Sequence, residues 1–445
     1  MSRTTDLVSH VLGIVGTRAD AGVYVRTGTS ALTRFANSFI HQNVSDDVAH
    51  VHLTVALDNR LASGSTTATT DDALNSLVDR LIEVAAMQPV DDEFAGFGGP
   101  VAPREIDHFD EETSRADPDA RAGIVKAFVD AGDGLLAAGM CGVDSYTDAY
   151  GNTAGRFIDG RMTRVILDGI HQTETSAGSG HSAGPSLSSI DAAGAGKLAS
   201  DRAMRAIDAF DTKPGEYEVI LAPEAMATIA QFLTGYGFSG KSYNEGTSFV
   251  TLDEQRFDAA VHLKDDVADP RGLGISFDAE GTPRGTVALI DGGVTPSLLH
   301  DRRTAKKAGG VSTGHAPVAG EAWDSRPGGR NLFFGEGPSS EQDLIAQVER
   351  GIYVSTFNYC RVLDPKTVVV TGLTRNGTFM IENGAITGAV TNLRFTQSFI
   401  DALGPTRVKG IGSNSRFADG EDEPGTVHTP SFHLASWNFT GGVEG

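Results

Sequence analysis

The feature that most constrains this fold is a change of hydrophobic period within the first 90 residues. From Gly22 to Thr54 apolar and polar residues alternate, which is typical of half-buried strands. After Thr70 two acidic residues, favourable at the positive end of a helix, precede apolar residues at helical spacing from Leu74 to Ala85. The sequence therefore predicts an antiparallel ribbon followed by a helix, so the first half is α plus β.

The length of the chain predicts more than one domain. Its 445 residues exceed the roughly 250–300 at which a single hydrophobic core stops growing. A strong turn signal at residues 211–215 marks a boundary, and beyond one helix over residues 223–234 the remainder reads mostly as strands. We therefore expect an α+β fold with an N-terminal α/β domain (strand ribbon plus helices) over residues 1–212 and a β-rich C-terminal domain over residues 213–445.

Three segments carry local turn or loop signals. Asn-Gly pairs at residues 376–377 and 383–384 lie between apolar alternations and predict the hairpin turns of a β-meander. Residues 176–189 are rich in Ser, Gly and Pro, which predicts a surface loop. The acidic run at residues 419–423 predicts a solvated loop near the C-terminus.

Composition excludes two classes of partner. The chain has 36 Lys and Arg against 58 Asp and Glu, a net charge of −22, with no basic run for binding nucleic acid. The longest apolar stretch, residues 134–143, is about half of the ~20 residues that cross a bilayer. The N-terminus lacks the pattern of a secretory signal, and the two cysteines, Cys141 and Cys360, are far apart. We expect a cytoplasmic protein with no nucleic-acid or membrane partner.

Two short motifs match catalytic patterns without the structure that those patterns need. Residues 235–242 satisfy the phosphate-loop pattern, with Lys241 in the lysine position, but a predicted helix rather than a strand leads into them. Residues 180–184, with Ser182 at the centre, satisfy the nucleophile-elbow pattern, but neither a buried strand nor a helix is predicted beside them. We interpret both as chance matches in a Gly- and Ser-rich chain.

None of the twelve histidines forms the one-turn pair of a helix-borne zinc site. His300 and His315 are the most site-like, because polar and charged residues surround them in the sequence. With Asp301 and Glu321 they are the candidates for acid–base chemistry. The simpler alternative is that both histidines are loop residues with backbone partners.

Four blocks of the sequence resemble the TldD/PmbA family, in the same order and nearly from end to end. They read TRFANSFIHQN at residues 33–43, FDAEGTP at 277–283, STGHA at 312–316 and GLTRNGTFMIENG at 372–384. The resemblance implies a two-domain TldD/PmbA-like architecture. It also implies two related subunits, TldD and TldE (also called PmbA), that pair as a cytoplasmic metallopeptidase and cleave unfolded peptides inside a closed chamber.

The resemblance further implies that the TldD-type subunit holds zinc. Its His-Glu-x-x-x-His motif lies on the helix after the strand that corresponds to Tyr217–Leu221, and a distant Cys is the third ligand. The corresponding helix here, residues 223–234, has no histidine, and none occurs between His181 and His262. The chain thus resembles the TldE type. We expect no metal, cofactor or confident catalytic residue in this chain, with zinc in a TldD-type partner.

Three hypotheses remain open from the sequence. The first is a zinc-free subunit that forms part of a dimer chamber with a TldD-like homologue, or with itself, and holds unfolded peptides along an exposed strand edge. The second is a stand-alone homodimeric, metal-independent amide hydrolase for a small metabolite, which would use His300, Asp301, His315 and Glu321. The third is a nucleotide-binding protein that depends on Lys241.

Overall fold

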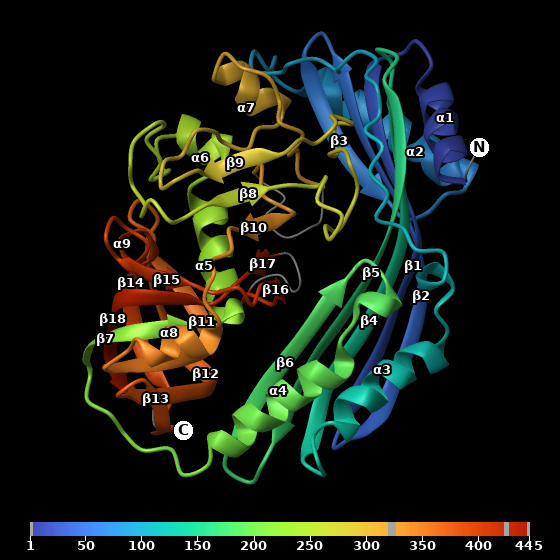
Figure 1. Cartoon of the computed structure of the whole chain (residues 1–445). Helices are drawn as coiled ribbons and strands as arrows, with labels where there is room; N and C mark the ends of the chain where they lie inside the picture. Colours follow the sequence, from blue (N-terminus) through green and yellow to red (C-terminus); the bar gives the residue numbers. More distant parts are fainter. Residues whose placement is uncertain (1–2, 319–325, 422–426, 443–445) are drawn as a thin grey trace.

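The computed structural model describes residues 3–318, 326–421 and 427–442 and has the predicted α+β class (Figure 1). Its N-terminal part is built on one six-stranded antiparallel sheet in the order β3-β2-β1-β4-β5-β6. The predicted ribbon is confirmed as the long pair β1 and β2. The strands are β1 (Asp20–Ala36), β2 (Phe39–Leu57), β3 (Arg60–Thr66), β4 (Leu136–Asn152), β5 (Phe157–Gln172) and β6 (Ala177–Gly184).

Two pairs of helices cover opposite ends of this long sheet (Figure 1). Helices α1 (Arg3–Val15) and α2 (Asp71–Met87) share one apolar core with β1, β2 and β3, and α2 confirms the helix predicted after Thr70. Helices α3 (Pro118–Asp130) and α4 (Ala192–Arg205) share a second core with β4 and β5. The sheet is thus stabilised at each end by a separate hydrophobic core.

The segment predicted to be a surface loop, residues 176–189, is instead mostly a strand. β6 pairs antiparallel with β5 and packs against α4. A Cβ atom at Gly178 or Gly180 would lie 2.2 or 2.0 Å from a backbone carbonyl oxygen of α4, at Ala199 and Ala195 respectively. Glycine therefore allows the helix to approach the strand closely. The loop prediction was wrong because the same composition also suits this packing.

The C-terminal part contains two sheets, one of five strands in the order β16-β17-β10-β8-β9 and one of seven. The seven-stranded sheet has the order β11-β7-β18-β14-β12-β13, with β15 paired to β18. The predicted boundary between residues 212 and 213 falls between α4 and β7 and stays a prediction. The strands are β7 (Gly215–Leu221), β8 (Leu263–Asp265), β9 (Val287–Ile290), β10 (Leu332–Phe334), β11 (Arg350–Asp364), β12 (Val369–Glu382), β13 (Ala385–Ala389), β14 (Leu393–Ser398), β15 (Val408–Ile411), β16 (Arg416–Ala418), β17 (Val427–Thr429) and β18 (Phe432–Gly442).

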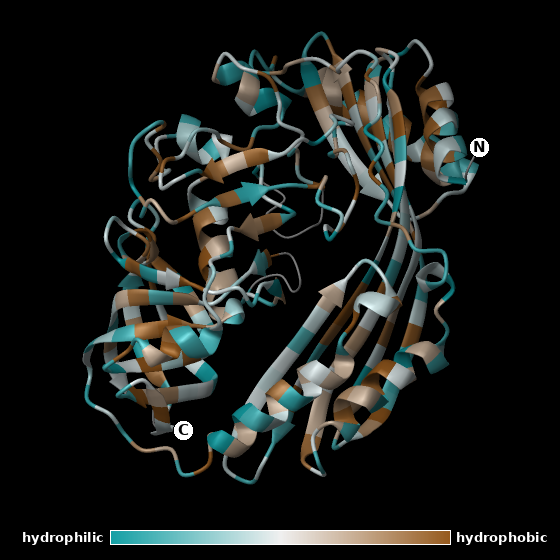
Figure 2. Cartoon of the chain, in the orientation of Figure 1, coloured by the Kyte–Doolittle hydropathy of each residue, from teal (hydrophilic) through white to brown (hydrophobic). Residues whose placement is uncertain are grey.

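Helix α5 (Pro223–Tyr236) runs through the centre of this part and confirms the helix predicted from residue 223 (Figure 1). Its residues from Pro223 to Thr234 are all buried, and most belong to the largest hydrophobic core. Most of these residues are apolar, as expected of a helix that protein surrounds on all sides, and its colouring in Figure 2 is mostly that of hydrophobic residues. The remaining helices are short: α6 (Gly240–Asn244), α7 (Arg302–Lys307), α8 (Glu341–Ala346) and α9 (Phe399–Ala402).

The two Asn-Gly pairs have different structural roles. Asn383 and Gly384 have φ values of 51° and 77° and form the predicted hairpin turn between β12 and β13. Asn376 and Gly377 instead lie inside β12, where two residues face the single Ser355 of β11. They form a β-bulge rather than a turn, so this part of the prediction was wrong. No helix among the described residues is long and apolar enough to span a membrane.

Candidate functional site

The first turn of α5 carries a buried charged group. The Glu224 side chain is fully buried, and its two carboxylate oxygens accept hydrogen bonds from Arg416 (2.8 Å) and Arg202 (3.3 Å). Burial alone would raise the pKa of Glu224, but the two guanidinium groups hold that pKa well below its ordinary value. Arg202 comes from α4 and Arg416 from β16, so these two ion pairs join α5 to the preceding helix and to a strand far along the chain.

The last turns of α5 lie under the segment that follows β16. Gln231 is 8% exposed, and a Cβ atom at Gly420 would lie 2.1 Å from its side-chain oxygen. The side chains of Asp419 and Glu421 are only 11% and 14% exposed, and Glu421 accepts a 2.7 Å hydrogen bond from the backbone N–H of Cys360. The prediction of a solvated loop was therefore wrong for residues 419–421, while residues 422 and 423 lie outside the described residues.

Asp419 belongs to a cluster with His181 and Asp168. The Nδ1 atom of His181 on β6 lies 2.8 Å from Asp168 Oδ1 and 3.0 Å from Asp419 Oδ2. Asp168 is paired with His181 across the β5–β6 ladder, whereas Asp419 directly follows β16, more than 200 residues further along the chain. Burial lowers the pKa of His181, but the two carboxylates outweigh burial and raise that pKa well above its usual value. For the acidic Asp419, burial has the opposite effect and raises the pKa of its carboxyl group.

Two cavities flank β6, one near each end of the strand. The first, of about 590 Å³, is bounded by His181 to Pro185 on one side and by Arg271, Arg416 and His428 on the other. The second, of about 600 Å³, lies between residues 172–177 and the bulged part of β12. The strand thus borders open space beside the His181 cluster. Sequence reasoning missed this site because His181 drew attention only as part of the nucleophile-elbow match at residues 180–184, which was interpreted as a chance match.

The predicted site residue His315 is completely buried with Asp265. Its Nε2 atom lies 3.2 Å from Asp265 Oδ1, and its Nδ1 atom lies 2.9 Å from Thr313 Oγ1. The other Asp265 oxygen accepts hydrogen bonds from the backbone N–H groups of Arg330 (2.6 Å) and Asn331 (3.0 Å). Burial raises the pKa of Asp265, but His315 outweighs it and the pKa falls to about 2. Both ring nitrogens of His315 therefore have hydrogen-bond partners.

The structure brings three of the four predicted site residues close together. His315 donates its backbone N–H to the carbonyl of His300 (3.3 Å), and Asp301 directly follows His300. Asp301 caps α7 by accepting hydrogen bonds from the N–H (2.7 Å) and hydroxyl (2.8 Å) of Thr304, which also lies 3.1 Å from His300 Nδ1. These contacts fit structural roles. Glu321, the fourth candidate, lies outside the described residues.

Neither short catalytic motif has the structure that its chemistry needs. Helix α5, rather than a strand, leads into residues 235–242, and glycines 237 and 240 pack against the rings of Phe249 and His300. The five-residue α6, which was not predicted, begins within the motif at Gly240. Ser182 lies within β6 and its hydroxyl accepts a 3.1 Å hydrogen bond from the backbone N–H of Asp191. It is therefore not at a strand-to-helix turn.

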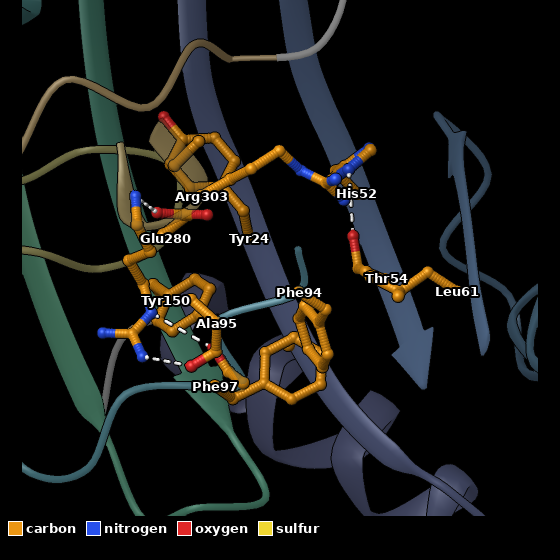
Figure 3. Close-up of a pocket in the computed structure, with 14 residues that line it drawn as sticks. Tyr24, His52, Thr54, Leu61, Phe94, Ala95, Phe97, Tyr150, Glu280 and Arg303 are labelled. Carbon is orange, nitrogen blue, oxygen red and sulfur yellow. Dashed lines mark hydrogen bonds between the residues drawn. The ribbon is translucent and has the colours of Figure 1, made fainter. Parts of the chain in front are cut away.

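Glu280, which belongs to one of the four family-like blocks, lines a small cavity of about 120 Å³. Figure 3 shows its carboxylate among the aromatic side chains that line this pocket, including Tyr24, Phe94 and Tyr150. One carboxylate oxygen accepts a 2.9 Å hydrogen bond from the backbone N–H of Arg302. Burial, with smaller contributions from the acidic groups nearby, raises the pKa of Glu280 to about 8.

Comparison with known proteins decides the family. A family model described as the PmbA/TldA metallopeptidase C-terminal domain matches residues 214–441, and one described as PmbA/TldA metallopeptidase domain 1 matches residues 21–85. The chain belongs to the PmbA/TldD family. The resemblance inferred from four sequence blocks is confirmed, and with it the membership of a metallopeptidase-like family.

The curated relatives are distant in sequence, and a solved structure of similar fold is equally distant. A metalloprotease of Methanothermobacter thermautotrophicus is 25% identical over 301 residues, which cover 65% of each chain. A TldD homologue of Buchnera aphidicola is 24% identical over 52% of this chain and 49% of its own. The chain thus spans about half to two thirds of these curated relatives. The crystal structure of TldE from Thermococcus kodakarensis superposes with a TM-score of 0.85 at 18% identity, covering 98% of this chain and 99% of that one.

Proposed function

We propose that this chain is a TldE/PmbA-like subunit without catalytic zinc. In this proposal it pairs with a zinc-bearing TldD-like homologue in a cytoplasmic peptidase that acts on unfolded peptides. Its own contribution is part of the wall of the chamber and half of the dimer interface. The zinc and the water that it activates would belong to the partner.

One observation carries the proposal, namely the composition and burial of α5. This helix follows β7, as the metal-bearing helix of the TldD type does by the resemblance, but residues 223–236 contain no His, Cys or Asp. Its one carboxylate, Glu224, has both oxygens engaged by arginines. Gln231 is covered by the segment around Gly420. An α5 of this composition offers no set of ligands for a tetrahedral zinc.

The surroundings of β6 support a role in holding peptides. β6 is the last strand in the order of its sheet, and cavities of about 590 and 600 Å³ border it near its two ends. An extended peptide can add to such an edge through backbone hydrogen bonds, which demand little of its sequence. We therefore propose β6 as the edge that faces the peptide chamber.

Co-purification with metal analysis tests the proposal. The tagged chain is expressed with a TldD-like homologue from the same genome, and each purified species is assayed for cleavage of an unfolded protein such as reduced, alkylated casein. We expect a heterodimer that cleaves the substrate, no cleavage by this chain alone, and loss of activity when the zinc motif of the partner is mutated.

Two outcomes would contradict the proposal. Robust, EDTA-sensitive cleavage of casein by the chain alone would make it a peptidase in its own right. EDTA-resistant hydrolysis of small amides by the chain alone, lost in the His300→Ala and His315→Ala variants, would favour the stand-alone amide hydrolase. The His10→Ala variant, in which an exposed histidine is removed, is the control for both arms.

A further inference from the structure

The imidazole of His181 lies in an arrangement that ordinary hydrogen bonding does not explain. Its Nδ1 atom is buried and makes no hydrogen bond of normal geometry, although carboxylate oxygens of Asp168 and Asp419 lie 2.8 and 3.0 Å away. A ring nitrogen has one proton or one lone pair, directed along a single axis. Two oxygens at these distances, both in poor hydrogen-bond geometry, indicate that neither lies on that axis.

The two distances are ordinary for an ion pair, but together with this geometry they also fit ligands around a cation. Nitrogen and oxygen ligands lie ~2.1 Å from a small divalent ion, so two of them at right angles to each other are separated by ~3.0 Å. With an ion on the Nδ1 axis, both carboxylate oxygens would lie off that axis and close to the observed 2.8 and 3.0 Å from Nδ1. The three ligand atoms all lie within 4.8 Å of one another, the one such group of His, Cys, Asp and Glu in the described part of the chain.

We propose that His181, Asp168 and Asp419 bind one divalent cation of the Mn²⁺ or Zn²⁺ class. A neutral imidazole with two carboxylates has a charge of −2, which balances the ion. Imidazole favours transition metals and carboxylates favour harder ions, so the mixed set suits Mn²⁺ and Zn²⁺ better than Ca²⁺. The residues lie on β5, on β6 and after β16, so none of the three proposed ligands belongs to α5.

At this position a bound cation would link two parts of the chain. Asp168 and His181 belong to the N-terminal sheet, whereas Asp419 immediately precedes Gly420, which lies against Gln231 of α5. A bound ion would fasten the segment that covers α5 to the edge of that sheet. Three protein ligands also leave coordination positions for water, and His181 borders the cavity of about 590 Å³ through which water can enter.

Metal binding to the purified, EDTA-treated full chain tests this inference. Calorimetry with MnCl₂ and, separately, with ZnCl₂ should show one site per chain, and thermal unfolding should move to higher temperature with the ion. The variants His181→Ala and Asp419→Asn should weaken binding at least ~10-fold, because the first removes the imidazole ligand and the second replaces a charged carboxylate with a neutral amide. His10→Ala, which breaks an exposed imidazole–carboxylate pair, should bind as wild type does.

A spectroscopic measurement keeps the inference testable if a variant does not fold. In wild-type protein loaded with Mn²⁺, electron spin-echo modulation should report coupling to one imidazole nitrogen. No stoichiometric binding, binding unchanged by both variants, or bound Mn²⁺ without nitrogen coupling would each overturn the site and leave a plain ion-pair cluster. These outcomes are independent of the co-purification assay, which concerns peptide cleavage with the partner.

Discussion

Two histidines of this chain face carboxylates in different ways. His315 and Asp265 form a buried pair in which both ring nitrogens and both carboxylate oxygens have partners. His181 instead directs one nitrogen toward Asp168 and Asp419, neither in normal hydrogen-bond geometry, beside a large cavity. The first arrangement has the features of a structural pair and the second those of a binding site. The difference teaches that saturation of polar atoms, rather than residue type, separates the two roles.

The largest expected effect tests the saturated pair. Asp265→Ala leaves the His315 imidazole and two backbone N–H groups buried without their acceptor, which should lower the free energy of unfolding by about 3–5 kcal/mol. Denaturant titration measures this change. Asp291→Ala is the matched control, because Asp291 also lies 3.0 Å from a histidine, His262, but both side chains are more than half exposed. If Asp265→Ala lowers the free energy of unfolding by less than about 1 kcal/mol, the His315–Asp265 pair does not differ from an exposed ion pair and the comparison with His181 fails.

The second prediction tests the strand that holds His181. A methyl group at Gly180 would overlap the Ala195 carbonyl of α4, so Gly180→Ala should lower the free energy of unfolding by about 1–3 kcal/mol. Because His181 is the next residue, the same variant should weaken Mn²⁺ binding. The control is Gly123→Ala on α3, where no atom beyond the backbone of the helix itself lies within 4 Å of the added carbon and stability should stay equal or rise. Wild-type stability in Gly180→Ala would mean that α4 and β6 are not closely packed.

The third prediction concerns Glu280, a buried carboxylate without an imidazole partner. Its pKa of about 8 in the folded state exceeds the ordinary 4.5, so between these values the folded chain keeps a proton that the unfolded chain loses. The contribution of Glu280 to stability should therefore fall as pH rises from about 4.5 to about 8, while His52 and His428, whose pKa values burial lowers to about 4, contribute in the opposite direction below pH 6.5. Glu280→Gln should remove on the order of 1 kcal/mol of this fall, measured by denaturant titration at pH 5 and pH 8.5. Parallel pH profiles for variant and wild type would show that Glu280 is ionised.

The smallest effect is expected at the second carboxylate of the His181 cluster. In EDTA-treated protein, Asp419→Asn should change the free energy of unfolding by no more than about 1 kcal/mol, because Asp168 still faces His181. Thermal unfolding without added metal measures it. A loss as large as that of Asp265→Ala would mean that Asp419 and His181 form a saturated structural pair, and the comparison would fail.

Local signals in the sequence predicted the elements that depend on local periodicity. The ribbon of β1 and β2, helix α2 and helix α5 follow from hydrophobic spacing, and the turn at Asn383 follows from its Asn-Gly pair. The bulge at Asn376 could not be predicted from its Asn-Gly pair, because the same dipeptide suits either a turn or an unpaired kink within a strand. Strand β6 could not be predicted from local signals either, since only the close approach of α4 explains its glycines.

By itself the sequence determined the fold class, the family and the absence of His, Cys and Asp from residues 223–236, because periodicity, ordered blocks and residue identity are all local properties. Only the tertiary structure decided which charged groups meet. Asp168 and His181 are brought together by strand register, and Asp419 reaches them because the segment after β16 packs on α5. No local pattern encodes such a meeting, since it depends on how distant elements bury their surfaces against one another.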